Sequence, residues 1–352
     1  MSGERGYLRE TGNLVFHTAL IGVLVSVGIG GGFGFAGQRV IVEGQAFVNT
    51  LASYDSFNPG RFFTESSLEP FTIVLDSFDV SYEEQNRNAL GQPIDFTANV
   101  TTTLRGGSPT PATIKVNEPL TISGTQAYLL GNGYAPRIIV RDAAGEIAFE
   151  QAVACLPIDA NLSSICIVKV PDGLDSQVGM IGLLYPSAVT LDTGALASNY
   201  PDLINPLLSL EVYVGDLGLD AGVATNAYAL NTAELEQVAG RTADSPTIVL
   251  APGETAELPN GLGTVELESI PRFVSLDIHR DPSQGWVLLF SVLVVAGLLT
   301  SLFIPRRRMW VKAVVGAQGV TLEYAALARG DDPTLEAAVA ALADRHTEIL
   351  KA

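Results

Sequence analysis

Two long apolar runs lie near the two ends of this chain. The first covers residues 14–36, and the second, from Gly285 to Ile304, contains no charged residue. Each run is long enough to cross the roughly 30 Å hydrocarbon core of a bilayer as a helix. The pattern therefore predicts transmembrane helices over residues 14–36 and 285–304.

The charges beside the two runs predict their orientation. Arg5 and Arg9 precede the first run, and residues 306–308, all arginine, follow the second. Because arginine-rich flanks stay in the cytoplasm, we expect residues 1–13 and 305–352 there and residues 37–284 outside it. A signal peptide is the alternative for the first run. That run is long for a signal peptide, and its glycine-rich end lacks a convincing small-residue cleavage site.

Between the runs the pattern changes to short, β-branched segments separated by turn residues. The predicted strands are 71–75, 94–100, 113–116, 137–141, 147–152, 165–170, 210–214, 247–250, 264–267 and 273–278. Many short strands at such spacing predict a mainly-β, sandwich-like domain. Residues 173–209 have no clear period and are predicted to form a long crossover or lid. Residues 233–238 are predicted to form a short helix.

The last 48 residues have a different pattern. Residues 311–315 and 320–324, joined by the turn 316–319, predict a β-hairpin, and Asp331, Asp332 and Pro333 open a helix that runs to about Leu350. The predicted fold class is a membrane protein with two transmembrane α-helices that flank a mainly-β extracytoplasmic domain. A small α+β cytoplasmic tail follows.

Acidic residues concentrate in the segment between the runs. Residues 39–284 contain 11 Lys and Arg against 30 Asp and Glu, whereas the whole chain has a net charge of −18. This composition argues against nucleic acid as a partner, because phosphate binding needs clustered basic residues. The charge either only keeps the domain soluble or favours basic partners.

Sequence motifs of common enzymes are missing. The histidines His17, His279 and His346 are far apart in sequence, and the chain has no HExxH, CxxC, Walker A, GxSxG or CxxCH motif. An ordinary hydrolase or nucleotide enzyme is therefore disfavoured. A structural disulfide is the simplest interpretation of Cys155 and Cys166, the two cysteines of the chain. A thiol-exchange pair and two unpaired buried thiols are the alternatives.

His17 lies inside the first apolar run. An ionisable side chain in a membrane helix usually faces a partner or a cavity rather than lipid. His17 is either a hydrogen-bonded interhelical residue or an axial ligand to a haem held among helices, since neutral imidazole suits iron.

Three stretches together resemble one family. They are Arg9–His17, which leads into the first run, Asn117–Leu120 with Gly133–Pro136, and Asp281–Gly285 with Pro305–Val311 around the second run. In this order they resemble the ResB (CcsB) family of system II cytochrome c biogenesis proteins. The resemblance covers nearly the whole chain.

The resemblance implies a subunit of a haem transport and ligation complex in the bacterial plasma membrane. Such proteins pair with a multi-spanning ResC (CcsA) partner and deliver haem b to apocytochrome c outside the cytoplasm. A thioredoxin-like protein keeps the apocytochrome cysteines reduced. His17 occupies the position of a histidine that the family uses in a membrane haem site. Asn117, Glu118, Tyr134 and Pro136 are interpreted as turn and core residues that shape the β-domain, with a docking role as the alternative.

The chain departs from the family in its number of spans. Family members usually have two further spans before the one that carries His17, so the first two are expected to be encoded separately or to precede Met1. The resemblance implies a non-enzymatic subunit. The alternative functions are a membrane-anchored β-sandwich scaffold without haem and an extracytoplasmic thiol oxidoreductase.

Overall fold

The computed structural model describes residues 1–220, 226–317, 319–330 and 332–351, and the chain forms two compact units. We call residues 1–34, 60–63 and 281–352 the anchor unit, and residues 35–59 and 64–280 the β-domain. The predicted fold class is confirmed, because two long apolar helices flank a mainly-β domain along the chain.

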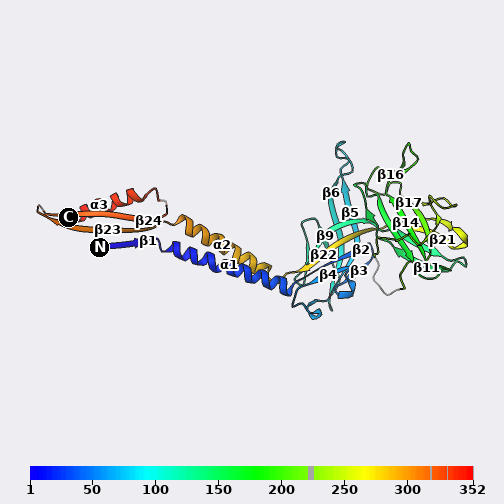
Figure 1. Ribbon diagram of the computed structural model, residues 1–352, viewed down its shortest axis with the longest axis horizontal. Coiled ribbons are helices and arrows are strands. Elements are labelled where there is room, and N and C mark those ends of the chain that lie inside the picture. Colours follow the sequence, from blue (N-terminus) through cyan, green and yellow to red (C-terminus); the bar gives the residue numbers. More distant parts are fainter. Residues whose placement is uncertain (221–225, 318, 331, 352) are drawn as a thin grey trace. The chain divides into compact units, whose positions relative to one another are not determined.

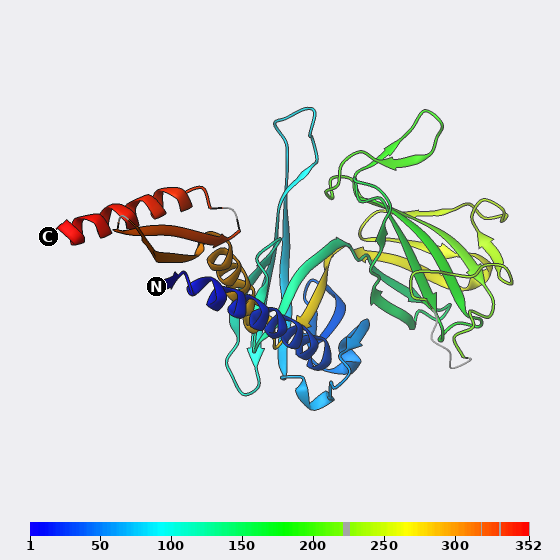
Figure 2. The ribbon, with the colours of Figure 1, turned by 60° about the vertical axis from the view of Figure 1, so that its left-hand side comes forward.

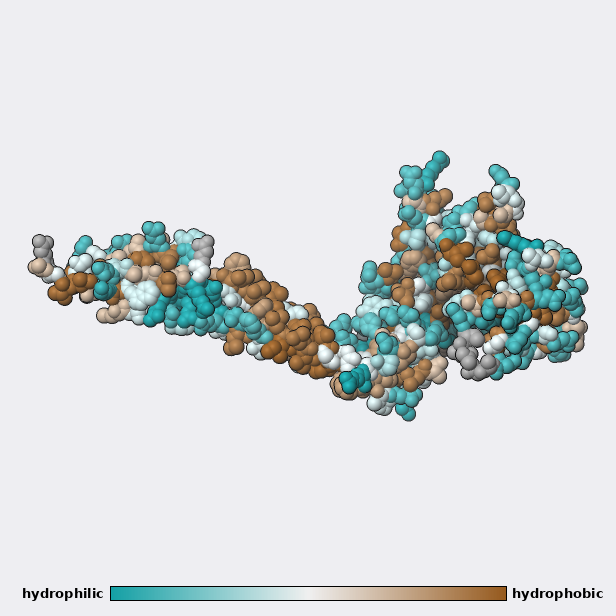
Figure 3. All heavy atoms as spheres, in the orientation of Figure 1, coloured by the Kyte–Doolittle hydropathy of each residue, from teal (hydrophilic) through white to brown (hydrophobic). Residues whose placement is uncertain are grey.

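Two helices form the centre of the anchor unit, α1 (Leu8–Phe33) and α2 (Gln284–Phe303), and they run side by side (Figures 1 and 2). Both are long and apolar enough to cross a membrane. On the face seen in Figure 3, hydrophobic residues cover most of the length of the helix pair, as expected for helices that face lipid, and hydrophilic residues lie at the end where α1 begins.

Small residues set the distance between α1 and α2. A Cβ atom on Gly12 would lie 2.8 Å from Thr300 Cβ and 2.9 Å from the Gly297 carbonyl oxygen. Close backbone approach of this kind is how membrane helices gain packing contacts. At the other end of α1, a Cβ on Gly30 would meet the side chains of Asp281 and Ser283.

The two helices differ slightly in extent from the predicted membrane spans. Helix α1 begins six residues before residue 14, because Arg9 and Glu10 extend the helix beyond its apolar part. Helix α1 ends at Phe33. Phe35, although apolar, is the first residue of the next strand and belongs to the β-domain. Helix α2 begins and ends one residue before the predicted span 285–304.

The N-terminal strand and the C-terminal tail together form a three-stranded antiparallel sheet, the tail sheet, with one helix on it (Figure 2). Its elements in sheet order are β1 (Ser2–Arg5), β23 (Arg306–Gly316) and β24 (Gly319–Arg329), followed by α3 (Leu335–Lys351). The predicted hairpin is present and longer than expected. Strand β1 was not predicted, because it is too short to show a pattern. Asp331, at the predicted start of the helix, lies outside the described residues.

The β-domain contains two sandwiches. The first has one sheet of β4 (Ser56–Pro59), β2 (Phe35–Val42), β22 (Arg272–Arg280), β9 (Thr125–Tyr134) and β8 (Leu120–Ile122). Its second sheet has β3 (Ala46–Val48), β5 (Phe71–Tyr82), β6 (Pro93–Leu104) and β7 (Thr110–Lys115). Residues Ile41, Ile73, Leu75, Val100 and Ile278 are at most 1% exposed and belong to its core.

The second sandwich is larger. One sheet has β11 (Ile147–Ala152), β10 (Arg137–Arg141), β21 (Gly263–Ser269) and β20 (Glu254–Leu258). The other has β12 (Leu156–Pro157), β13 (Ser164–Val170), β14 (Val178–Tyr185), β17 (Leu207–Val214) and β18 (Glu236–Ala239), with β19 (Ile248–Leu250) beside β17. A hairpin of β15 (Ala188–Thr190) and β16 (Leu196–Ser198) follows β14. Short 3-10 turns occur at Leu51–Ser53, Glu65–Ser67 and Pro259–Gly261.

Each of the ten predicted strands coincides with an observed strand, but two other predictions for this domain were wrong. Residues 173–209 are not a lid, because β14 pairs with β13 and β17 inside the second sandwich. Alternation is hard to see in β14 because Gly179 and Gly182 leave room for neighbouring leucines. Residues 233–238 do not form a helix, since Glu236–Ala239 pairs with β17 as strand β18.

Candidate functional site: the membrane histidine

His17 lies in the third turn of α1 and its side chain is exposed on the helix surface. Its Nδ1 atom lies 2.8 Å from the main-chain oxygen of Asn13, one turn earlier. Because a carbonyl oxygen only accepts hydrogen bonds, Nδ1 must carry the proton and donate it. In the neutral form of the ring the lone pair is then on Nε2, the atom that binds metals in most histidine sites whose other nitrogen is held in this way.

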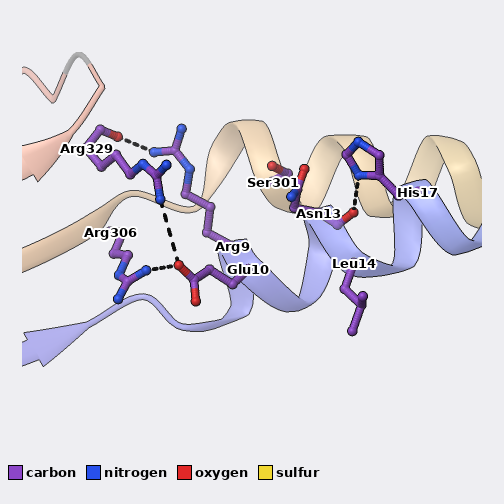
Figure 4. Close-up of a pocket in the computed structure, with 8 residues that line it drawn as sticks. All are labelled: Arg9, Glu10, Asn13, Leu14, His17, Ser301, Arg306 and Arg329. Atoms are coloured by element: carbon purple, nitrogen blue, oxygen red, sulfur yellow. Dashed lines mark hydrogen bonds and ion pairs between the residues drawn. The ribbon is translucent and has the colours of Figure 1, made fainter.

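A pocket of about 640 Å³ adjoins His17 (Figure 4). It is lined by residues of α1, the end of α2 and two strands of the tail sheet: Arg9, Glu10, Asn13, Leu14, His17, Ser301, Arg306 and Arg329. The arginines gather at the end where α1 begins, and His17 lies two turns further along the helix. The pocket thus joins a polar rim to the apolar part of the helix pair.

Ion pairs organise the rim. Arg306 contacts Glu10, lies 3.1 Å from Glu4, and places its guanidinium 5.5 Å from the centre of the Tyr7 ring. Arg9 donates a hydrogen bond to the main-chain oxygen of Arg329. These contacts tie the start of α1 to the tail sheet, so the wall of the pocket has a defined position relative to His17.

An imidazole with a free Nε2 can supply one axial ligand to a haem iron. The described residues contain no group of three or more His, Cys, Asp or Glu that could hold a metal ion. The His17 side chain is exposed, so its Nε2 atom is accessible to a ligand from outside the chain.

Comparison with known proteins gives a clear result for the chain as a whole. A family model described as the ResB-like family matches residues 1–340, nearly the whole length. The chain belongs to the ResB-like family. This family is associated with cytochrome c biogenesis, acts there as part of a complex and is found at membranes. No curated protein matches the chain.

The family motif Gly133–Pro136 lies where the chain crosses from one sandwich to the other. Strand β9 ends at Tyr134 in the first sandwich, and β10 begins at Arg137 in the second. The chain returns between β21 and β22, and the main-chain N–H of Ala135 donates to the Pro271 oxygen at 2.8 Å. The motif therefore shapes the junction of the two sandwiches.

Tyr134 is fully buried at this junction and holds a charged residue beside it. Its hydroxyl donates to the Pro201 oxygen at 2.9 Å, and burial raises its pKa well above the usual value, so the donor stays protonated. The Arg272 guanidinium lies over the Tyr134 ring at 4.7 Å and 2.7 Å from the Asp202 carboxylate. Arg272 was not expected from the sequence, because its partners lie 70 and 138 residues away.

Asn117 also has a structural role. It adopts a left-handed backbone conformation (φ 64°) in the turn between β7 and β8, where Lys115 and Glu118 exchange main-chain hydrogen bonds. Asparagine tolerates this conformation better than most residues. Asn117 therefore shapes the turn between β7 and β8.

Cys155 and Cys166 are joined by a disulfide with a Cα–Cα distance of 4.4 Å. Both residues are at most 1% exposed, within the core of the second sandwich. The N–H of Cys155 donates to the Tyr134 oxygen at 3.1 Å, so the disulfide also borders the junction. Because the sulfur atoms are buried, a thiol-exchange partner has no access to them in this conformation.

The other two histidines have local partners. His279 stacks on Tyr128 with ring centres 4.9 Å apart, and His346 lies 2.8 Å from the Tyr324 hydroxyl. The sequence drew attention to His17 but missed the arginines around it. One signal was present: Arg9, Asn13 and His17 are four residues apart, which places them along one side of a helix.

Proposed function

We propose that this chain is the subunit of a membrane complex that carries haem b to apocytochrome c outside the cytoplasm, with His17 as one axial ligand of the travelling haem. The observation that carries the proposal is the His17 ring, which is exposed within an apolar helix and has Nε2 available. Membership of the ResB-like family supports the biological process. The chain acts as scaffold and conduit, without catalysing a reaction itself.

Each part of the chain has a task in this proposal. The helices α1 and α2 hold the haem among apolar side chains and exclude water, and a ResC (CcsA)-like partner supplies the opposite ligand. The β-domain lies outside the cytoplasm, where it docks the partner and the apocytochrome. A thioredoxin-like protein reduces the apocytochrome cysteines. Both termini lie in the cytoplasm.

An absorption spectrum tests this proposal. The chain is purified together with its multi-spanning partner, and the Soret band is recorded for the wild type and for His17→Ala. We expect the band to weaken severalfold and to shift in the variant, because one axial ligand is lost. His346→Ala is the matched control, since it removes a histidine of the same unit outside the pocket. No Soret band in any sample would contradict the proposal and favour a scaffold without haem.

A variant without the disulfide tests the alternative that the chain is a thiol oxidoreductase. Cys155→Ser removes any dithiol chemistry, while loss of a disulfide of this loop length lowers stability by about 2–4 kcal/mol. We expect cytochrome maturation to persist at reduced temperature, in proportion to the amount of folded protein. Loss of maturation at an unchanged protein level would instead support a redox role.

A further inference from the structure

The pocket beside His17 has an excess of positive charge. Among its eight lining residues are three arginines, from α1, β23 and β24, and one glutamate. They are up to 320 positions apart in the sequence, and the fold brings their side chains to one rim (Figure 4).

The three arginines differ in how far their charge is already balanced. Arg306 is 21% exposed and is bound by Glu4 and Glu10. Arg329 is 76% exposed, and the Glu10 carboxylate is 3.9 Å from it. Within the described part of the chain, Arg9 has a hydrogen bond to a main-chain oxygen and no ion pair with a carboxylate. Arg9 and Arg329 therefore have charge available for an anion from outside the chain.

The spacing along α1 relates these charges to His17. Arg9, Asn13 and His17 follow at intervals of four residues, each a rise of about 6 Å, so Arg9 and His17 are about 12 Å apart along the axis. Side chains on a helix lean toward its N-terminus, which turns the His17 ring toward the arginines. The hydrogen bond from Nδ1 to Asn13 fixes this direction.

We propose that Arg9 and Arg329 bind the carboxylates of the same haem whose iron is bound by His17. This inference rests on the proposed function. Haem is a flat, largely apolar ring with the iron at its centre and two carboxylates on one edge. Guanidinium groups bind carboxylates in paired hydrogen bonds, and at this rim the carboxylates stay near water while the ring lies along the apolar helix surface. Arg306, held by two glutamates, forms the wall of the site.

A comparison of haemin with haemin dimethyl ester tests the inference, because the ester keeps the iron and removes the two negative charges. The full-length chain in detergent is titrated with each compound, and the Soret band gives the affinities. We expect the wild type to bind haemin about tenfold more tightly than the ester, the effect of one or two charge-assisted hydrogen bonds. Arg9→Gln/Arg329→Gln should lose this preference.

Three further variants separate the possible causes of the preference for haemin over its ester. Arg345→Gln, an exposed arginine of α3 outside the pocket, should keep the tenfold preference. Arg329→Gln alone, at a mostly exposed side chain, should lose part of it without disturbing the fold. His17→Ala should change the spectrum but keep the preference for the free carboxylates.

The outcomes distinguish this inference from the proposed function. Equal affinities of the wild type for haemin and its ester would overturn the carboxylate site, while a His17-dependent band would leave the proposed function standing. If no His17-dependent band appears, both fail. Native mass spectrometry gives a third arm: if the double variant loses bound phosphatidylglycerol and keeps its haemin preference, the arginines bind a lipid headgroup and the inference is wrong.

Discussion

The Asp332 carboxylate accepts two hydrogen bonds from the Arg307 guanidinium, at 2.6 and 2.9 Å. It also accepts hydrogen bonds from the side chain and main chain of Thr334, just before α3. The bonds from Arg307 contribute most to lowering the pKa of Asp332, to about 2 from its ordinary value of 3.8. This ion pair joins β23 to the start of α3.

The lowered pKa predicts how the tail responds to acid. Because the folded pKa lies below the unfolded one, the pair stabilises the tail fully above about pH 4, and the stabilisation is lost as pH falls through about 2. We expect α3 to loosen from the sheet between pH 4 and pH 2. Hydrogen exchange of the α3 amides, corrected for intrinsic rates, measures this. In Asp332→Asn, α3 should already be loosened at pH 5. If the variant shows the same pH dependence of hydrogen exchange as the wild type, the Asp332–Arg307 ion pair is not what holds α3.

Single residues were predictable from the sequence where a side chain conflicts with its surroundings. His17 stands out because a polar ring interrupts an apolar run. Arg9 does not stand out, because arginines beside a membrane span are expected for orientation alone. Arg329 does not stand out either, because it lies 26 residues after the end of α2 in the sequence. Their common position follows only from the pairing of β23 with β24 and the docking of α1 beside them.

At the scale of elements, the close contact of α1 and α2 depends on glycine. Gly12 lies against Gly297 and Thr300, whereas a Cβ atom on Gly28 of the same helix would have no neighbouring atom within 4 Å. The same residue type therefore has opposite roles on two sides of one helix. This difference provides a matched pair of variants.

We expect Gly12→Ala to destabilise the helix pair by about 1–3 kcal/mol, the usual cost of overpacking against backbone that cannot easily move. Gly28→Ala should be neutral or slightly stabilising, because alanine favours helix over glycine by about 1 kcal/mol. Thermal unfolding in detergent measures both. Equal shifts in the two variants would mean that the helices do not meet at Gly12.

Strands were predictable where the sequence alternates clearly or is rich in β-branched residues. The wrong prediction of a helix at residues 233–238 has a physical reason. Residues 233–238 contain alanine, leucine and glutamate, which favour helix locally, but burial of Val238 and Ala239 against the second sandwich selects the strand. Pairing over long distances in sequence overrides local preference in such cases, and a single sequence does not reveal it.

At the scale of the whole molecule, the acidic β-domain and the arginine-flanked helices predict which parts face which compartment. We expect a cysteine introduced at the exposed position Asp175 to react with a membrane-impermeant maleimide on intact cells. A cysteine introduced at Arg345 should react only after the membrane is opened. The opposite labelling pattern would invert the proposed orientation and remove the basis for haem export.

The pairing of β2 with β22 has a consequence for how the chain is made. The two strands are neighbours in one sheet, yet about 230 residues lie between Val42 and Arg272, which are close to their facing ends. At roughly 5–20 residues per second, a ribosome needs roughly ten to fifty seconds to reach the second strand after the first. During this time the edge of β2 that later pairs with β22 is open, so we expect chaperones to bind the nascent domain until just before α2 is translated.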